Sequence, residues 1–295
     1  MLFYCYICPR ACGALREESA GHGVCGQGLT ARVARAAPHM WEEPPVSGER
    51  GSGTVFFSGC ALRCVYCQNY RLSRGEQGVA VTPERLREIY FELIEKGVHN
   101  INLVTAGHFI DAVLESLADP LPVPVVWNSS GYESVETLKR LEGRVQVYLP
   151  DMKYAGAAIA GRYSSAPDYP EIARAAIMEM YRQRGPYVLD GDGLIKSGVI
   201  IRHLVLPNAL ENTRAVIDWV ADTFGPGQVL FSLMSQYTPM GRAGDFPEIA
   251  RRLTPEEYTE AVEYMERRGI EDGFYQELSS AKEEYTPEFD LTGVI

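Results

Sequence analysis

The chain has 295 residues, of which 46% are hydrophobic and 23% are charged, and its formal net charge is −11. These proportions are typical of a soluble globular protein, and the acidic balance argues against nucleic acid as a partner, because nucleic-acid surfaces carry a basic stripe. No apolar run reaches membrane-spanning length and no secretory signal opens the chain. We therefore expect a cytoplasmic protein without a membrane partner.

Seven cysteines fall into two groups, and none is left over. In a chain without an export signal, thiols are expected to bind metals rather than to pair as disulfides. The first group is Cys5, Cys8, Cys12 and Cys25, within a cysteine-rich segment that we place at 1–37. Four thiolates form a closed ligand set for either zinc or a [4Fe–4S] cluster, and so short a polar segment needs a metal to hold its fold. The sequence leaves both metals open.

The next segment, 38–53, is rich in proline and glycine, and we interpret it as a linker without secondary structure. From residue 54 onward, apolar strands alternate with helical patterns. Strands are predicted at 54–57, 100–104, 123–127, 145–149, 199–206 and 229–233. Helices are predicted at 82–97, 109–117, 135–141, 169–184, 216–224 and 254–269, the first and last capped by Thr82 and Thr254.

Near-continuous apolar strands that alternate with helices predict an α/β fold with a parallel sheet covered on both faces. Six strand–helix units are too few for the usual eight-stranded barrel. We therefore expect a partial (β/α)6 TIM-like barrel over 54–278, with the cysteine-rich segment before it. A charged and aromatic tail at 279–295 is expected to cover the mouth or the base of the barrel.

The second cysteine group, Cys60, Cys64 and Cys67, directly follows the first predicted strand. A closed structural metal site needs four ligands, whereas a site that performs chemistry keeps one position free. Three thiolates from one loop can hold three corners of a [4Fe–4S] cluster and leave the fourth iron open for a small cosubstrate. Tyr66, beside the last ligand, offers a face for a purine base. A zinc knuckle with a distant fourth ligand is the alternative.

This Cys-x3-Cys-x2-Cys spacing resembles the radical S-adenosylmethionine (SAM) superfamily. The similarity extends from GSGT at 51–54 through CQNY at 67–70 and includes RHLVLP at 202–207. In these two segments the chain resembles the branch of pyruvate formate-lyase activating enzymes. The resemblance covers nearly the whole chain. It implies a partial barrel, a SAM-binding [4Fe–4S] cluster on the three cysteines, and an electron donor such as flavodoxin or ferredoxin.

Functional residues in such a barrel gather where strands end, and the resemblance assigns SAM contacts there. The chain has TAGH at 105–108 where many radical SAM proteins carry Gly-Gly-Glu, so the backbone near Thr105 is expected to bind the SAM amino group. The predicted SAM contacts from the later strand ends are Asn128, Ser130, Asp151, Lys153, His203 and Gln236. Arg202 and His203 face opposite ways on one strand, and the resemblance places His203 toward SAM. Lys153 and Arg202 are candidate catalytic residues.

The resemblance implies that reduced cluster and SAM generate a 5′-deoxyadenosyl radical, which removes hydrogen from a glycine of a glycyl-radical enzyme or a peptide. A radical SAM enzyme that acts on a small molecule or on another peptide is one alternative. A non-catalytic iron–sulfur or zinc redox protein is another. The sequence does not decide whether SAM is consumed or regenerated.

Overall fold

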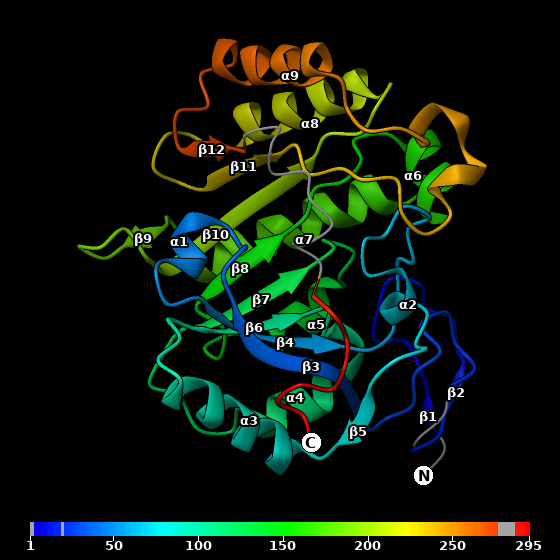
Figure 1. The fold of residues 1–295 in the computed structure, drawn as a ribbon, viewed down its shortest axis with the longest axis vertical. Helices are drawn as coiled ribbons and strands as arrows, with labels where there is room; N and C mark the ends of the chain where they lie inside the picture. The colour runs from blue at the N-terminus through cyan, green and yellow to red at the C-terminus, as the bar shows by residue number, and fades with distance from the viewer. Residues whose placement is uncertain (1–2, 19–20, 277–286) are drawn as a thin grey trace.

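A ten-stranded sheet organises the computed structural model, which describes residues 3–18, 21–276 and 287–295 (Figure 1). Its parallel strands, in spatial order, are β12 (Gly273–Tyr275), β11 (Leu230–Met234), β10 (Ile195–Leu204), β8 (Val147–Pro150), β7 (Val125–Ser129), β6 (Ile101–Val104) and β4 (Ser52–Phe57). All six predicted strands are among them, so the mixed α/β class is confirmed.

The two ends of this sheet remain apart, so it is open. Beyond β4 lie β3 (Ala31–His39) and β5 (Val79–Val81), both antiparallel to their neighbours, and β9 (Val188–Leu189) forms a hairpin with β10. The turn of that hairpin falls at 190–193, where the sequence is Asp-Gly-Asp-Gly. Every residue of β4, β7, β8 and β11 is buried, as expected for strands covered on both faces. The curvature of a partial barrel stays a prediction.

Helices follow the strands in chain order. They are α3 (Pro83–Glu95), α4 (Ile110–Ser116), α5 (Val135–Lys139), α6 (Ala157–Ser164), α7 (Tyr169–Arg184), α8 (Leu210–Thr223) and α9 (Pro255–Arg267). Figure 1 shows α8 and α9 beyond β11 at one end of the sheet and α3 and α4 at the other. The Thr82 side chain caps α3, and Thr254 forms a capping box with Glu257, as predicted. No helix among the described residues has the length and hydropathy to cross a membrane.

The segment 38–53 was predicted to lack secondary structure, and this is wrong. Pro38 and His39 end β3, a short helix α1 (Pro44–Ser47) follows, and β4 begins at Ser52. The prolines are compatible with these elements, because Pro38 lies exposed at a strand end and Pro44 occupies the first turn of a helix. The segment therefore belongs to the main sheet and its surroundings.

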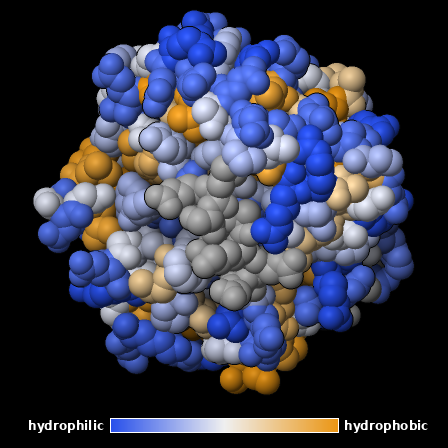
Figure 2. All heavy atoms as spheres, turned by 45° about the horizontal axis from the view of Figure 1, so that its top comes forward, coloured by the Kyte–Doolittle hydropathy of each residue, from blue (hydrophilic) through white to orange (hydrophobic). Residues whose placement is uncertain are grey.

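The N-terminal segment forms a small sheet of its own, and the C-terminal segment packs onto the main sheet. The N-terminal segment contains the small hairpin of β1 (Phe3–Tyr4) and β2 (Leu15–Arg16). At the other end, Leu291 N donates a hydrogen bond to Ala34 O, and Phe289 packs edge-on against Phe56. Residues 279–286 of the predicted tail lie outside the described residues. The face of the molecule in Figure 2 is mainly hydrophilic, with hydrophobic residues in small scattered groups.

Candidate functional site

A cavity of about 220 Å³ lies where the parallel strands end at their carboxyl edge. The loop after β4 supplies the three cysteines of the second group, and later strand ends supply polar side chains. The predicted site residues that line it are Tyr66, Thr105, Asn128, Ser130, Asp151, Lys153, Arg202 and Gln236, together with Cys60, Cys64 and Cys67. Sequence positions separated by more than a hundred residues therefore meet in one place.

The three thiols are held by the tight loop between β4 and α2 (Tyr70–Ser73). Gly59 and Arg63 have positive φ angles of 82° and 55°, which let the loop turn sharply. Burial raises the pKa of Cys67 to about 12 and also raises that of Cys60. The free thiols of Cys60 and Cys67 are therefore protonated at neutral pH, and binding to a metal is what makes them thiolates. Ser164 donates a hydrogen bond to Cys64 Sγ at 3.1 Å.

This donor set fits an open [4Fe–4S] cluster. Among the described residues, no three His, Cys, Asp or Glu side chains are grouped so that they hold a single metal ion. A cubane cluster does not need such a grouping, because each thiolate binds a different iron. Three thiols from one loop, which are the only cysteines among the described residues that line this cavity, suit a cluster with one free corner.

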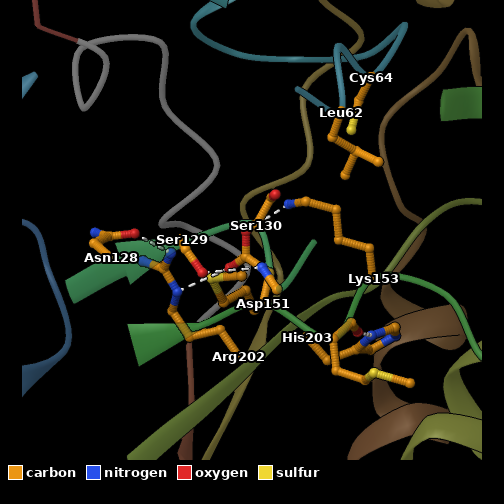
Figure 3. A network of polar contacts seen from close by, with 12 residues as sticks. Leu62, Cys64, Asn128, Ser129, Ser130, Asp151, Lys153, Arg202 and His203 are labelled. Atoms are coloured by element: carbon orange, nitrogen blue, oxygen red, sulfur yellow. Dashed lines mark hydrogen bonds and ion pairs between the residues drawn. The ribbon is translucent and has the colours of Figure 1, made fainter. Parts of the chain in front are cut away.

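Arg202 is the centre of a buried polar network on the floor of the cavity (Figure 3). Its Nε donates to Asp151 Oδ1 at 2.9 Å, and its Nη2 donates to Asn128 Oδ1 at 2.7 Å. Its Nη1 lies 3.2 Å from Glu42 Oε2 and 3.7 Å from Glu43 Oε2. One guanidinium therefore contacts three carboxylates, and their attraction raises the pKa of Arg202.

Lys153 extends this network toward the cysteines. Its Nζ donates to Asp151 Oδ2 at 2.6 Å, and the Cys64 thiol also favours its charge. Burial opposes both charges of the pair. Even so, Arg202 and Lys153 lower the pKa of Asp151, and Asp151 raises the pKa of Lys153. The pair is therefore charged at neutral pH.

Glu42 and Glu43 are site residues that the sequence reasoning missed. Glu42 Oε1 accepts hydrogen bonds from Asn102 and Asn128, and Glu43 Oε1 accepts one from Ser232. Burial raises the pKa of Glu42 and raises that of Glu43 from 4.5 to about 7. The only sequence signal was an acidic pair just before two prolines, inside a stretch that was interpreted as a linker.

The predicted orientation of Arg202 and His203 is wrong. Arg202 faces the cavity, whereas His203 is fully buried on the other side of β10. His203 Nδ1 lies 2.7 Å from Met152 O and Nε2 lies 3.0 Å from Thr213 Oγ1. A carbonyl only accepts, so Nδ1 carries the proton and Nε2 accepts from the Thr213 hydroxyl. His203 is a core histidine, and burial lowers its pKa to about 4.

We therefore expect His203→Ala to lower the free energy of unfolding by about 1–3 kcal/mol, because Met152 O and the Thr213 hydroxyl lose their partner. SAM affinity should stay unchanged. Urea unfolding and SAM titration of the cluster-loaded protein measure both quantities, and Thr213→Val should give a smaller loss of the same kind. A variant of normal stability that no longer binds SAM contradicts this assignment.

The cysteines of the first group lie beside the second group. Cys5 and Cys25 are buried, Cys8 is partly buried and Cys12 is exposed. Cys8 and Cys60 line the same small cavity of about 20 Å³. All seven cysteines are free thiols in the structure.

Comparison with known proteins agrees with this geometry. Residues 46–171 match the family model described as a 4Fe-4S single cluster domain. Uncharacterized protein MJ0674 of Methanocaldococcus jannaschii is 29% identical over 279 residues, which cover 90% of this chain and 75% of that protein.

Two solved structures resemble the fold. SuiB of Streptococcus suis, bound to precursor peptide SuiA, superposes with a TM-score of 0.50 at 12% identity, over 76% of this chain and 48% of that chain. The FeFe-hydrogenase maturase HydG of Carboxydothermus hydrogenoformans gives 0.49 at 14% identity, over 77% of this chain and 54% of that chain. The chain thus spans about half the length of each. The matched cluster domain agrees with a [4Fe–4S] site on the Cys60–Cys67 loop, which lies within it, and the likeness to SuiB shows a related fold.

Proposed function

We propose that this chain is a radical SAM enzyme that removes a hydrogen atom from a glycine of a protein or peptide, as glycyl-radical activating enzymes do. The observation that carries the proposal is the meeting of Cys60, Cys64 and Cys67 with polar groups from successive strand ends in one cavity. The cluster would supply one electron for reductive cleavage of SAM, and a flavodoxin or ferredoxin would deliver it. The residues of this chain bind and orient SAM and exclude water.

The charges of the cavity suit SAM, which is a net cation at neutral pH. The acidic side chains of Glu42 and Asp151 line the cavity together with Arg202 and Lys153, and Glu43 Oε2 lies 3.7 Å from Arg202 Nη1. Lys153 Nζ has three donors and Asp151 occupies one, so Lys153 can also bind the SAM carboxylate. Tyr66 would pack against the adenine, and Gln236, which follows β11, lines the same cavity.

Hydroxyl and amide groups of the cavity would hold the ribose and the amino group of SAM. Asn128, Ser130 and the backbone at Thr105 line the cavity. Thr105 has a φ of 60°, which a β-branched residue rarely adopts, and strain of this kind gathers at functional sites. Phe56, Leu62 and Leu204 provide apolar wall that keeps water out.

A peptide or protein substrate is supported by SuiB, which has a related fold and is bound to a precursor peptide. A small molecule, or a peptide residue other than glycine, is the alternative substrate.

We place the protein in the cytoplasm, because seven free thiols suit a reducing compartment. We further propose that the cysteine-rich segment 1–37 binds a metal, that 54–278 binds SAM together with elements of 38–53, and that 279–295 is a tail. The cysteines of the first segment would bind zinc or a second [4Fe–4S] cluster.

The test is to mix anaerobically reconstituted, chemically reduced protein with SAM and to measure 5′-deoxyadenosine and methionine. We expect both products in equal amounts, and none without the reductant. Following SAM through several turnovers with substrate decides whether it is consumed or regenerated. A protein that loads its cluster but leaves SAM intact would be a non-catalytic redox protein, and the proposal would fail.

A further inference from the structure

Arg10 lies between Cys8 and Cys12 in the sequence, and its side chain reaches the loop that carries the second cysteine group. We propose that Arg10 is a positioning residue for the cluster of that loop: it holds the backbone N–H groups that face Cys60 Sγ, and so helps to set the reduction potential of the cluster. The proposal rests on the [4Fe–4S] site of the proposed function. It is the same whether the first cysteine group binds zinc or a second cluster.

The guanidinium of Arg10 binds backbone carbonyls of the loop. Its Nε donates to Ala61 O at 2.9 Å and its Nη2 donates to Leu62 O at 3.3 Å. Nη2 also donates to Ser164 O at 2.7 Å, and Nη1 donates to Ser165 O. A guanidinium presents five N–H donors in a rigid fork, whereas the ammonium of a lysine has three donors on one atom. Arg10 can therefore hold two successive peptide groups of the loop at once.

The same two peptide groups face the sulfur of Cys60. The peptide group that contains Ala61 O also contains the Leu62 N–H, which donates to Cys60 Sγ at 3.4 Å. The peptide group that contains Leu62 O also contains the Arg63 N–H. Burial raises the pKa of the Cys60 thiol, and hydrogen bonds from the Arg63 and Leu62 N–H groups oppose that rise. Arg10 therefore binds the oxygen ends of the peptide groups whose nitrogen ends face Cys60.

The loop needs such support, because its backbone is strained at this point. Arg63 has a φ of 55°, which residues other than glycine adopt only where their surroundings enforce it. Leu62 O belongs to the peptide group directly before this strained residue, so the bond from Arg10 helps to keep the Arg63 N–H turned toward the sulfur. A peptide group with hydrogen bonds at both ends is polarised, and each bond strengthens the other.

The backbone of Arg10 is anchored in the first cysteine group. Ala11 N donates to Cys8 O at 2.9 Å and closes the turn that contains Arg10. Burial raises the pKa of the Cys8 thiol to about 12, and a hydrogen bond from the Arg10 N–H opposes this rise. One residue thus contacts a thiol of the first group through its backbone and the loop of the second group through its side chain.

A second ligand of the cluster is linked to Arg10 through Ser164. Arg10 Nη2 binds the carbonyl of Ser164, and the hydroxyl of Ser164 donates to Cys64 Sγ at 3.1 Å. Hydrogen bonds to the sulfurs stabilise the added negative charge of a reduced cluster and are among the factors that set its potential. Loss of Arg10 should therefore weaken donors to two sulfurs and make the cluster harder to reduce.

The test is a redox titration of anaerobically reconstituted full-length protein, followed by electron paramagnetic resonance. The signal that is lost when Cys60→Ser, Cys64→Ser and Cys67→Ser are combined identifies the cluster of the loop. In Arg10→Gln we expect the reduced fraction of this cluster at a fixed potential to fall by about 10-fold, which is a shift of about 59 mV for one electron. Electron–nuclear double resonance after exchange into D2O should show weaker coupling of exchangeable protons to the cluster.

Two variants separate positioning from charge and from a general loss of hydrogen bonds. Arg87→Gln is the matched control, because Arg87 Nη1 also donates to two backbone carbonyls, Ser116 O at 3.1 Å and Asp119 O at 3.0 Å, but at the end of α4. It should leave the potential unchanged. Arg10→Lys keeps the charge without the fork and should restore only part of the shift. Full restoration by lysine would mean that charge alone acts, and it would overturn the positioning role.

The outcomes also separate this inference from the proposed function, because no SAM is present in the titration. An unchanged potential in Arg10→Gln, with SAM cleavage intact in the wild type, overturns the inference alone. The expected shift in a protein that leaves SAM intact overturns the proposed function alone. If no [4Fe–4S] signal depends on the three cysteines of the loop, both fail.

Discussion

Cys64→Ala is expected to abolish the formation of 5′-deoxyadenosine while leaving the fold intact. Cys64 is one of three thiols that line the cavity and is the most buried of them, so no water or other side chain takes its place. Losing an outer-shell partner of a metal typically costs about 10–100-fold in affinity or activity, and losing a ligand costs more. Cys60→Ala and Cys67→Ala should behave in the same way.

Two control variants separate ligand loss from a general disturbance of the loop. Ser164→Ala removes the hydroxyl that donates to Cys64 Sγ and should lower activity by no more than about 100-fold. Arg71→Ala alters an exposed side chain on α2, just after the loop, and should change nothing. Product formation and iron content are measured for each variant. Near-normal product from any single cysteine variant contradicts the assignment of three ligands.

The positions of the parallel strands and the gathering of site residues could be predicted from sequence for a simple physical reason. Parallel strands buried on both faces give continuous apolar runs, and their carboxyl ends lie at one edge of the sheet. Polar residues that follow such runs, such as Asn128 and Asp151, must therefore meet. The helix caps at Thr82 and Thr254 could be predicted equally well, because capping depends on local sequence alone.

The sheet face toward which Arg202 and His203 each point could not be predicted in this way. Side chains alternate along a strand, so Arg202 and His203 must point to opposite faces of the sheet. Both faces of this strand are buried, so the alternation does not decide which of the two polar side chains faces the cavity. The choice depends on partners distant in sequence. Asp151 and Glu42 attract Arg202 to the cavity, while Met152 O and Thr213 satisfy His203 behind the sheet. Glu42 escaped notice because the register of β3 on β4, which brings it to the cavity, is a tertiary property.

Arg202→Met is expected to be the most destabilising single change in the site, with a loss of about 3–5 kcal/mol in the free energy of unfolding, because it leaves buried carboxylates without their cation. Methionine approximates the volume of the arginine stem, so the loss reports charge and hydrogen bonding rather than a cavity. Arg267→Met is the matched control. Arg267 pairs with Glu263 on α9, both side chains are 59% exposed, and such pairs contribute about 0–1 kcal/mol.

The pH dependence of Arg202→Met identifies the cause. In the wild type, burial already holds the pKa of Glu43 at about 7 against its usual 4.5, so Glu43 makes the fold less stable as pH rises from about 4.5 to about 7. Without Arg202 the pKa values of Glu42 and Glu43 should rise further, and their protonation at low pH should relieve the penalty. The stability deficit of Arg202→Met is therefore expected to be larger at pH 8 than at pH 5, as measured by urea unfolding.

Adding Glu42→Gln and Glu43→Gln to Arg202→Met should recover part of the loss at pH 8. A deficit that is independent of pH, or no recovery in the triple variant, means that Arg202 stabilises the fold by packing and not by its charge.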